Sequence, residues 1–510
     1  MGERIMPQSG DEYLESLRDG REVWIYGERV DDVTTHPAFR NSARSIARLY
    51  DAFHDPERSG RLLRPTDTGS GGQTHPFFKV AKSKQDLRDS ADAIKVWQEI
   101  NFGWLGRSPD YKAAMLTTLG ANPEWFGEYE QNARTWYRKS QESVLHMAHA
   151  IANPPVDRAG AIEDSGDVFV HVERETDAGL IVSGAKVVAT GAPLTQAVFV
   201  SHFLAPVRDR AFALQFIAPM NAPGVKILAR ASYEEVAARA AAPFDYPLSS
   251  RLDENDAILI FDHALIPWEN VTIYDVDKVM AFPHVSGWMH RGKLQSVQRL
   301  VTKFEFIAGL VSRALEITGA GEFRGVQAAL GEIIASIHIM NAIKDGMIEG
   351  AVPDFGPESI GPNPNYANAY AALAPNLYRK ARALIEEIIA SGLIYLNSNA
   401  IDFETPEIRP LLDRYLRGSN GRTALDRSRT MKMLWDAIGS EFGARHELYE
   451  LNYFGQPEAH HLAALRVART SGLMARWEGM VDALASEYDT SGWLAPDLIQ
   501  PSDVSFLVER

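Results

Sequence analysis

The sequence contains no cysteine in its 510 residues. This absence excludes disulfide frameworks, thiolate nucleophiles, cysteine-bound iron–sulfur clusters and cysteine-based zinc sites. Any redox chemistry must therefore come from an organic cofactor, or from histidine and carboxylate ligands. The chain is long enough to form a core that encloses a water-excluded site, so its size is compatible with an enzyme.

Positive charge is in deficit, with 52 Lys and Arg against 67 Asp and Glu, a formal net charge of −15. This sign disfavours a nonspecific phosphate-binding surface, so nucleic acid is not an expected partner. The first ten residues, Met1 to Gly10, contain no apolar run. No later segment approaches the roughly 20 uncharged apolar residues that a membrane span needs. We therefore expect a soluble cytoplasmic protein that has no membrane partner.

The spacing of apolar residues divides the chain into three regions and a tail. Helical periodicity predominates in the first third, alternating residues and turn signals then predict strands, and long helical stretches follow. We predict an α+β protein with an N-terminal helical domain (1–154), a middle antiparallel β-domain (155–275), a C-terminal helical domain (276–490) and a tail (491–510). No repeat of fixed period is visible, which argues against solenoids and propellers.

Two predicted helices of the first region carry the functional argument. The residues Ser108, Pro109 and Asp110 predict a helix start, because serine is a good N-cap, proline suits the first position and aspartate complements the helix dipole. A second helix is predicted over about 128–152 and should end before two consecutive prolines at 154 and 155.

Motifs for other enzyme classes are incomplete. Residues 287–294 (GWMHRGKL) are close to a phosphate-binding P-loop, but Leu294 stands where the magnesium-binding Ser or Thr belongs. The glycines of 319–325 do not fit the dinucleotide-binding spacing and are better explained by a helix C-cap at Gly319. Neither Gly-x-Ser-x-Gly nor His-Glu-x-x-His occurs, so common hydrolase and zinc-protease classes lack support.

Histidines and an Arg–Tyr pair are the candidate functional residues. His146 and His149, three apart on the predicted helix, could bind a metal together with Glu142, but a solvated helix face is the commoner arrangement and we predict no metal. Arg107 at a helix N-terminus and Tyr111 in its first turn would form a positive, hydrogen-bonding corner suited to a phenolate. From residue types alone, a surface Arg and a half-buried core Tyr remain the more common explanation.

Five short segments then occur in order along the chain. They are THP (35–37), GRSPDY (106–111), NPPVDR (153–158), PLSSR (247–251) and FGAR (442–445). Together they resemble the 4-hydroxyphenylacetate 3-monooxygenase family, the oxygenase components of two-component, reduced-flavin-dependent aromatic hydroxylases. The resemblance runs from about residue 9 to 490. Residues 173–177 and 186–190 look closest to the branch that hydroxylates carrier-tethered chlorotyrosine in enediyne antibiotic pathways.

The resemblance implies a fold and an activity. The fold would be acyl-CoA dehydrogenase-like, with a helical domain, a β-domain and a four-helix bundle. The protein would use FADH2, supplied by a separate NADH-dependent flavin reductase, and O2 to hydroxylate a phenol ortho to its hydroxyl, giving a catechol. The phenol would be tyrosine-derived or a 4-hydroxyphenyl compound, free or tethered to a carrier protein. Relatives are dimers or tetramers assembled through the helical bundle, and we expect a homotetramer.

The resemblance also assigns residues. Arg107, Tyr111 and His149 would hold the phenolic oxygen and act in catalysis, with His149 accepting the phenolic proton. Flavin contacts would fall on Pro155, Val156, Asp157, Arg158, Thr190, Gln456, Pro457 and Glu458, and further substrate contacts on Ser201 and His202. Some relatives carry Gln and Thr where this chain has Pro155 and Val188, so flavin hydrogen bonding there is weakened.

Rival classes share parts of this pattern. An acyl-CoA dehydrogenase-like flavoenzyme would have the same fold, but it requires a catalytic carboxylate beside the flavin. A noncatalytic flavin-binding protein is a further alternative. A related dehydratase that holds an iron–sulfur cluster is excluded by the absence of cysteine.

Overall fold

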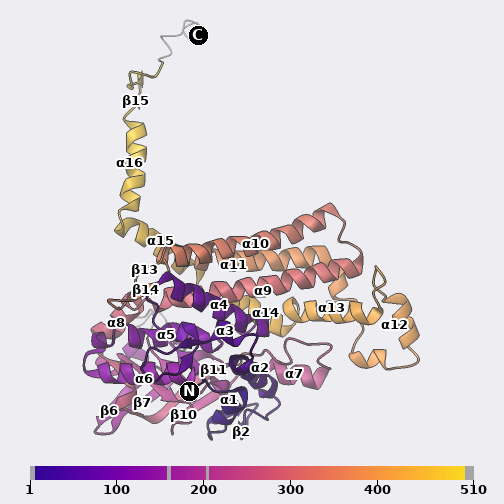
Figure 1. Cartoon of the computed structure of the whole chain (residues 1–510), viewed down its shortest axis with the longest axis horizontal. Coiled ribbons are helices and arrows are strands. Elements are labelled where there is room, and N and C mark those ends of the chain that lie inside the picture. The colour runs from indigo at the N-terminus through magenta and orange to yellow at the C-terminus, as the bar shows by residue number, and fades with distance from the viewer. Residues whose placement is uncertain (1–5, 158–161, 203–205, 500–510) are drawn as a thin grey trace. The chain divides into compact units, whose positions relative to one another are not determined.

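The computed structural model describes residues 6–157, 162–202 and 206–499. The chain forms two compact units, of which the first ends at Leu451 and the second begins at Asn452. The first unit contains the N-terminal helices, the sheets and the helical bundle (Figure 1). The second contains α15 (Pro457–Thr470), α16 (Leu473–Ala485) and the short strands β15 (Tyr488–Asp489) and β16 (Gly492–Trp493).

Helix α5 (Pro109–Ala121) is the central helix of the N-terminal region. The predicted helix start is confirmed, since Ser108 is the N-cap residue and Pro109 occupies the first turn. Nearly every residue of α5 is buried, including its polar members Asp110 and Lys112. A helix buried on all sides is surrounded by other elements, so its polar side chains face protein groups and not bulk water.

The other helices of this region surround α5 and the sheets. They are α1 (Gly10–Ser16), α2 (Arg40–Asp51), α3 (Ser59–Leu62), α4 (Lys84–Asn101) and α6 (Glu130–Ser143), with the small strands β3 (Arg64–Pro65) and β4 (Gln73–Thr74). Helix α4 begins in a capping box in which Ser83 and Asp86 bond to each other's backbone. Such reciprocal bonds satisfy backbone donors at the helix start.

Two sheets make up the β-region. Among the described residues the larger sheet has the order β2-β1-β10-β11-β7-β6, and the smaller has the order β12-β9-β8-β5. Their bounds are β1 (Glu22–Ile25), β2 (Glu28–Val30), β5 (Met147–Ala150), β6 (His171–Thr176), β7 (Gly179–Thr190), β8 (Ala197–Val200), β9 (Leu214–Pro219), β10 (Val225–Ala229), β11 (Asp256–Pro267) and β12 (Val271–Tyr274). The ladders between strands of the predicted β-domain are antiparallel, as predicted, and the parallel pairs β1–β10 and β5–β8 each include a strand from outside residues 155–275. Strands β1, β2 and β5 also come from before residue 155.

The predicted helix over 128–152 is wrong in its second half. Helix α6 ends at Ser143, where Val144 turns into the left-handed region with φ 49°. The chain then forms β5, every residue of which is buried, and His149 pairs with Phe199 of β8. Met and Ala favour helices, but pairing with β8 in the core outweighs that weak preference. His146 and His149 therefore do not share a helix face, which removes the geometric basis of the two-histidine metal site.

Long helices form the bundle that follows the sheets. They are α8 (Val276–Val285), α9 (Trp288–Thr318), α10 (Arg324–Glu349), α11 (Pro364–Ile389), α12 (Arg409–Tyr415), α13 (Ala424–Ile438) and α14 (Glu441–Leu451), with α7 (Tyr233–Ala240) before them and β13 (Val352–Pro353) and β14 (Ile360–Gly361) between α10 and α11. Helices α9, α10 and α11 run side by side (Figure 1). The long helical stretches predicted for this region are present. Gly319 caps α9 with φ 73°, as predicted.

The P-loop-like segment is part of α9. Its lysine, Lys293, donates to Oδ1 of Asn368 on α11 at 2.6 Å. Both residues are buried in the bundle. The segment therefore serves helix packing, and no phosphate-binding loop is formed by these residues.

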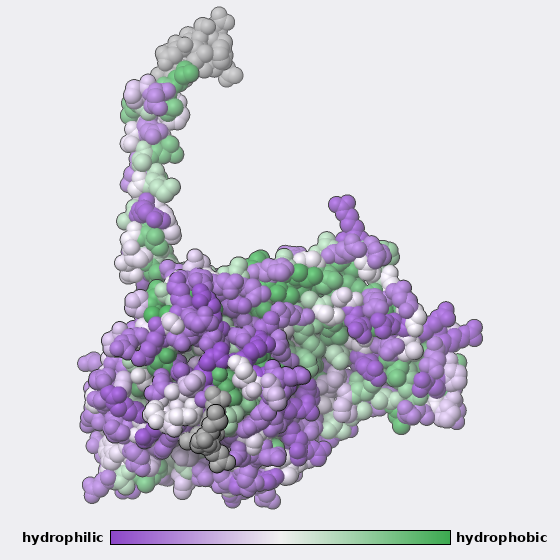
Figure 2. Space-filling view, in the orientation of Figure 1, coloured by the Kyte–Doolittle hydropathy of each residue, from purple (hydrophilic) through white to green (hydrophobic). Residues whose placement is uncertain are grey.

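Helix α10 has an apolar exposed face. It is long and apolar enough to cross a membrane by length and composition, with a mean hydropathy of 1.4 in its most apolar window. It nevertheless packs against α9 and α11, and Ile334 and Ile339 remain 41% and 45% exposed. Figure 2 shows apolar residues gathered over α10 and α11, whereas the surface over the sheets is mostly hydrophilic. This face is suited to contact with another apolar surface.

Candidate active site

Arg107 and Tyr111 lie together at the start of α5. The guanidinium carbon of Arg107 is 3.9 Å from the centroid of the Tyr111 ring, and both side chains are buried. A cation over an aromatic face is an attractive contact that fixes both groups. Burial raises the pKa of Tyr111, so its hydroxyl keeps its proton and remains a donor. The pair offers a permanent positive charge beside a neutral hydrogen-bond donor.

Strand β5 brings His149 to the same place. Its ring centroid is 5.7 Å from that of Tyr111. Burial, with added repulsion from Lys112 and Arg107, holds the pKa of His149 well below its usual value. The imidazole is therefore neutral, and one ring nitrogen has a free lone pair. The structure thus brings together Arg107, Tyr111 and His149, whose catalytic roles remain predictions.

Lys112 is a member of this cluster that sequence reasoning missed. Its Nζ lies 2.5 Å from Nδ1 of His149 and 4.5 Å from the Tyr111 ring centroid. Burial, together with the charge of Arg107, lowers the pKa of Lys112 well below its usual value. Among the residues that the structure describes, Nε2 of His149 has no hydrogen bond, so that nitrogen is left for a ligand. A lone lysine directly before the apolar run from Ala113 to Leu116 was the available signal.

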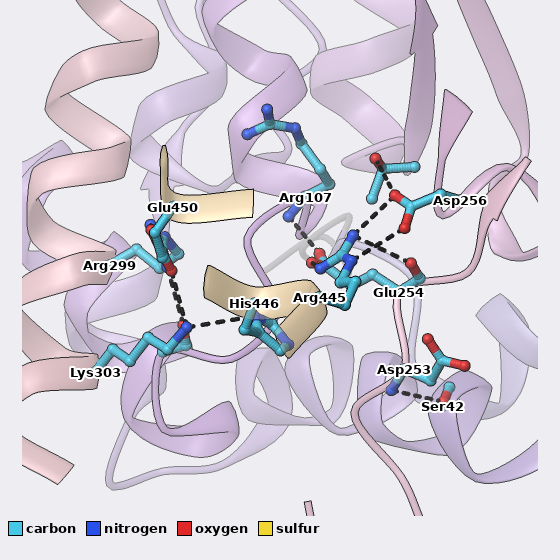
Figure 3. Close-up of polar contacts among 12 residues, drawn as sticks. Ser42, Arg107, Asp253, Glu254, Asp256, Arg299, Lys303, Arg445, His446 and Glu450 are labelled. Carbon is cyan, nitrogen blue, oxygen red and sulfur yellow. Dashed lines mark hydrogen bonds and ion pairs between the residues drawn. The ribbon is translucent and has the colours of Figure 1, made fainter. Parts of the chain in front are cut away.

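Backbone contacts fix the loop that carries Arg107 (Figure 3). The N–H of Arg107 donates to Oε1 of Glu254, as Figure 3 shows. The carbonyl oxygen of Arg107 is 3.2 Å from Nε2 of His146. Burial lowers the pKa of His146 to about 3, so this imidazole is neutral and its Nε2–H donates to the carbonyl. Both contacts are made by backbone atoms of Arg107 and not by its side chain. His146 therefore has a structural task.

The remaining member of the predicted metal site lies elsewhere. Glu142 accepts a hydrogen bond from Oγ1 of Thr68 at 2.9 Å. Within residues 6–157, 162–202 and 206–499, no three His, Asp or Glu side chains gather as a metal site would require.

Arg445 of α14 connects the Arg107 loop with Thr190. Its guanidinium contacts Glu254 at 3.4 Å and Asp256 at 2.8 Å, and Asp256 accepts from the Thr190 hydroxyl at 2.7 Å (Figure 3). Burial raises the pKa of Asp256, but the charges of Arg445 and Arg230 outweigh burial and hold the pKa well below its usual value. The FGAR segment supported the resemblance, but this connecting role was not predicted. Arg445 thereby links the loop that carries Arg107 to the strand β7 that carries Thr190.

A second buried network anchors α14 to α9. Glu450 accepts from Arg299 at 2.5 Å and from Lys303 at 2.9 Å, and Lys303 also contacts His446 (Figure 3). Burial alone would raise the pKa of Glu450, but the two cations lower it to about 2. Glu450 of α14 bridges two cations of α9, so the network connects these helices close to Arg445.

Thr190, a predicted flavin contact, lies at the end of β7. Because its hydroxyl hydrogen is donated to Asp256, the Thr190 oxygen can only accept a hydrogen bond from a further partner. A cofactor that binds here must therefore present an N–H or O–H group to Thr190.

Ser201 and His202 follow β8, the strand beside His149. The N–H of Ser201 donates to the carbonyl of Ala150 at 3.2 Å, and its hydroxyl donates to Gln215 at 3.0 Å. Both residues line a cavity of about 10 Å³, together with Lys186. This is room for about one water molecule, so a phenol enters there only if side chains move. Their substrate role stays a prediction.

The remaining predicted cofactor residues are dispersed. Pro155, Val156 and Asp157 are exposed in the loop after β5, and the bond from Val187 N–H to the Ala152 carbonyl places the start of this loop beside β7. Val188 is 58% exposed and has φ 55°. Arg158 lies outside the described residues. Gln456, Pro457 and Glu458 begin α15 in the second unit, and their cofactor role remains a prediction.

Family models match nearly the whole chain. The model described as 4-hydroxyphenylacetate 3-hydroxylase N terminal matches residues 9–273. The model described as 4-hydroxyphenylacetate 3-hydroxylase C terminal matches residues 279–482.

Individual relatives extend over nearly the same length. A 4-nitrophenol 2-monooxygenase oxygenase component from Rhodococcus sp. is 52% identical over 98% of this chain and 96% of its own. A (3S)-3-amino-3-(3-chloro-4-hydroxyphenyl)propanoyl-[peptidyl-carrier protein SgcC2] monooxygenase from Streptomyces globisporus is 50% identical over 96% of this chain and 93% of its own.

A solved structure has the same fold. The crystal structure of the oxygenase component of 4-hydroxyphenylacetate 3-monooxygenase, complexed with FAD and 4-hydroxyphenylacetate, superposes with a TM-score of 0.88. It is 32% identical and covers 94% of this chain and 100% of its own. The similarity therefore includes the helical region, the sheets and the bundle.

Proposed function

Since the chain belongs to the 4-hydroxyphenylacetate 3-hydroxylase family, we propose that Arg107, Tyr111 and His149 bind and activate a phenol for hydroxylation ortho to its hydroxyl. The predicted family and the α+β, acyl-CoA dehydrogenase-like fold are confirmed. The protein is a flavin-dependent monooxygenase of the oxygenase-component type, with FAD as cofactor and O2 as co-substrate. The observation that supports the residue roles is the buried cluster of one cation, one neutral donor and one neutral imidazole.

Each side chain has a task at the phenolic oxygen. Arg107 carries a charge at every relevant pH and stabilises a phenolate. Tyr111 donates a hydrogen bond to the same oxygen, and Nε2 of neutral His149 accepts the phenolic proton. The phenolate ring is a stronger nucleophile than the phenol, and its ortho carbon is activated. Burial of the cluster excludes water and strengthens these electrostatic contacts.

The flavin would lie against β7 and the loop after β5. When bound as FADH2, it supplies the electrons and activates O2. The exposed side chains of Val156 and Val188 offer apolar surface to a ring system, and the Thr190 oxygen accepts from an N–H on its edge. Pro155 and Val188 have no side-chain donors, so backbone groups make the hydrogen bonds there. For Arg158 and residues 456–458, the cofactor role rests on the family resemblance alone.

The proposed substrate is a phenol substituted at the 4-position. The Rhodococcus relative is named for 4-nitrophenol, and the Streptomyces relative for a carrier-bound 3-chloro-4-hydroxyphenyl group. Both names contain a 4-substituted phenol, one free and one tethered. A tyrosine-derived or 4-hydroxyphenyl compound, free or tethered, therefore fits the chemistry of the cluster.

Two of the nearby carboxylates are unsuited to acyl-CoA dehydrogenase chemistry, and a third, Asp110, accepts hydrogen bonds from Ser108 and Gln295. Such an enzyme needs a carboxylate free to remove a proton. Glu254 and Asp256, which lie near Arg107 and Thr190, are both ion-paired with Arg445. Neither is available as a base while that contact persists.

Oxidation of FADH2 in the presence of a phenol tests this function directly. We expect protein, reduced FAD and O2 to convert 4-hydroxyphenylacetate, or a carrier-bound tyrosine derivative, into a catechol, detected by mass spectrometry. The flavin absorbance should show slower reoxidation than in a protein-free control. A cytoplasmic NADH-dependent flavin reductase, separated by a dialysis membrane, should support turnover, because reduced flavin diffuses between the components. Protein-independent reoxidation with no catechol from either substrate would refute the function.

A second copy of the chain is the proposed occupant of the apolar α10 face. We expect a homotetramer assembled through the bundle, because exposed Ile334 and Ile339 are costly to leave in water. The double variant Ile334→Lys/Ile339→Lys should reduce the mass measured by light scattering to that of a smaller oligomer. Val236→Lys on α7, at 46% exposure, is the matched control and should keep the wild-type mass. A monomeric wild type, or a double variant of unchanged mass, would contradict the assembly.

A further inference from the structure

We propose that Lys112 is a positioning residue that receives the Nδ1 proton of His149 as His149 takes the phenolic proton at Nε2. The inference rests on the proposed function and adds the destination of the proton. Nζ of Lys112 and Nδ1 of His149 are in direct polar contact, 2.5 Å apart. Nothing in the family resemblance assigned a role to this lysine.

The two side chains lie on different elements, a helix and a strand, which hold them next to each other. Lys112 follows Tyr111 on α5, and His149 lies on β5 between Ala148 and Ala150. Lys112 is 1% and His149 8% exposed, so water does not readily replace either partner. An imidazole can accept a proton at one nitrogen while it donates from the other. The substrate and Lys112 would thus occupy opposite nitrogens of one ring.

The charges around Lys112 favour a neutral amine before the phenol binds. The amine of Lys112 lies over the Tyr111 ring, and the charges that act on it are those of Arg107, Asp110 and Glu254. Burial and Arg107 lower the pKa of Lys112, and the two carboxylates oppose this only in part. A neutral amine has a lone pair and accepts a hydrogen bond from Nδ1–H of His149. That contact selects the His149 tautomer whose Nε2 is free to act as a base.

The proton transfer is balanced without any further reagent. The phenolic O–H bond breaks and an Nε2–H bond forms, while the Nδ1–H bond breaks and an Nζ–H bond forms. The products are a phenolate, a neutral imidazole of the opposite tautomer and an ammonium on Lys112. The charge of the cluster is conserved, because the new negative and positive charges arise together. The imidazole avoids becoming a second cation beside Arg107.

Replacement of Lys112 by Met tests the proposed proton transfer from the phenol through His149 to Lys112, called the relay below. Methionine has nearly the length of lysine and removes a buried amine, so folding should be retained. We expect hydroxylation of 4-hydroxyphenylacetate to fall about 100-fold, the lower end of the range for general base catalysis. The pH profile should move to higher pH by about one unit or more, because the phenol must then ionise with less help. FADH2 binding should be unchanged.

A more acidic phenol separates proton transfer from structural damage. 4-Nitrophenol ionises in solution at mildly alkaline pH, so the Lys112→Met variant should hydroxylate it at close to the wild-type rate there. Lys293→Met removes another buried lysine, whose partner is Asn368 in the bundle, and should leave both reactions unchanged. Lys112→Gln, which also cannot become a cation, should repeat the Met result if the Met variant unfolds at a lower temperature.

Three outcomes would overturn the relay. An unchanged rate and pH profile in both Lys112 variants would show that the amine receives no proton. Equal losses with 4-hydroxyphenylacetate and 4-nitrophenol would assign Lys112 a purely structural task. A wild type that hydroxylates neither phenol, free or carrier-bound, would refute the proposed function itself, and this result is distinguishable because it does not depend on the variants.

Discussion

Replacement of Arg107 by Met is expected to lower kcat/KM for the phenol by about 100- to 1000-fold, the usual cost of removing one oxyanion donor. Arg107 is the permanent cation of the buried cluster, 3.9 Å from the Tyr111 ring centroid. Without it the phenolate loses its main electrostatic stabilisation, and substrate affinity should decline much more than FADH2 affinity. Steady-state kinetics and anaerobic flavin titration measure the two effects separately.

The structure also provides controls for the Arg107 variant. The backbone N–H and carbonyl of Arg107 make the contacts to Glu254 and His146, so the loop should persist without the side chain. Arg107→Lys retains a charge but loses the planar fork, and should recover part of the activity. Arg239→Met, on an exposed side chain of α7, should behave as wild type. An Arg107→Met variant with unchanged substrate affinity would remove the proposed role.

Replacement of His149 by Ala should lower catechol formation by about 100- to 10,000-fold, the range for loss of a general base. FADH2 should still bind and be oxidised, so the electrons should appear as hydrogen peroxide. The expected cause is the loss of Nε2, the nitrogen of a neutral imidazole that faces the ligand. Product and peroxide yields per flavin oxidised measure this uncoupling.

The pH dependence distinguishes a base from a structural histidine. Activity of His149→Ala should recover in part at alkaline pH, where the phenol ionises in solution. His263→Ala on β11, whose exposed ring contacts Glu173, is a matched control and should keep wild-type coupling. Parallel loss of flavin binding and product formation in His149→Ala would instead indicate that the ring maintains the fold.

The sequence allowed helix starts to be predicted better than strand pairing. Ser108 and Pro109 act locally, through the first turn of α5, so a few residues sufficed to place Arg107 and Tyr111. Strand β5 is different, because its pairing with β8 joins residues about 50 positions apart in the sequence. Its sequence of Met, Ala and His carries no strand preference of its own. His149 was therefore assigned to a helix, whereas it lies on a strand.

The contacts that hold the site were less predictable than its central residues. Lys112 and His149 are 37 positions apart, and Arg445 and Asp256 are 189 apart. Spacing patterns report neighbours on one helix or strand, and they contain no information on such distant pairs. Only the FGAR segment drew attention to Arg445, and it did so through resemblance, without a physical role.

The position of Arg445 near the end of the first unit has a consequence for biosynthesis. The substrate loop and the β-strands leave the ribosome long before α14 does, and domains generally fold as their residues emerge. Until residue 445 is available, Glu254 and Asp256 lack the guanidinium that joins them. A nascent chain therefore completes its strands before it can form the Arg445 contacts, and a chain truncated before α14 lacks the connection between the Arg107 loop and Thr190.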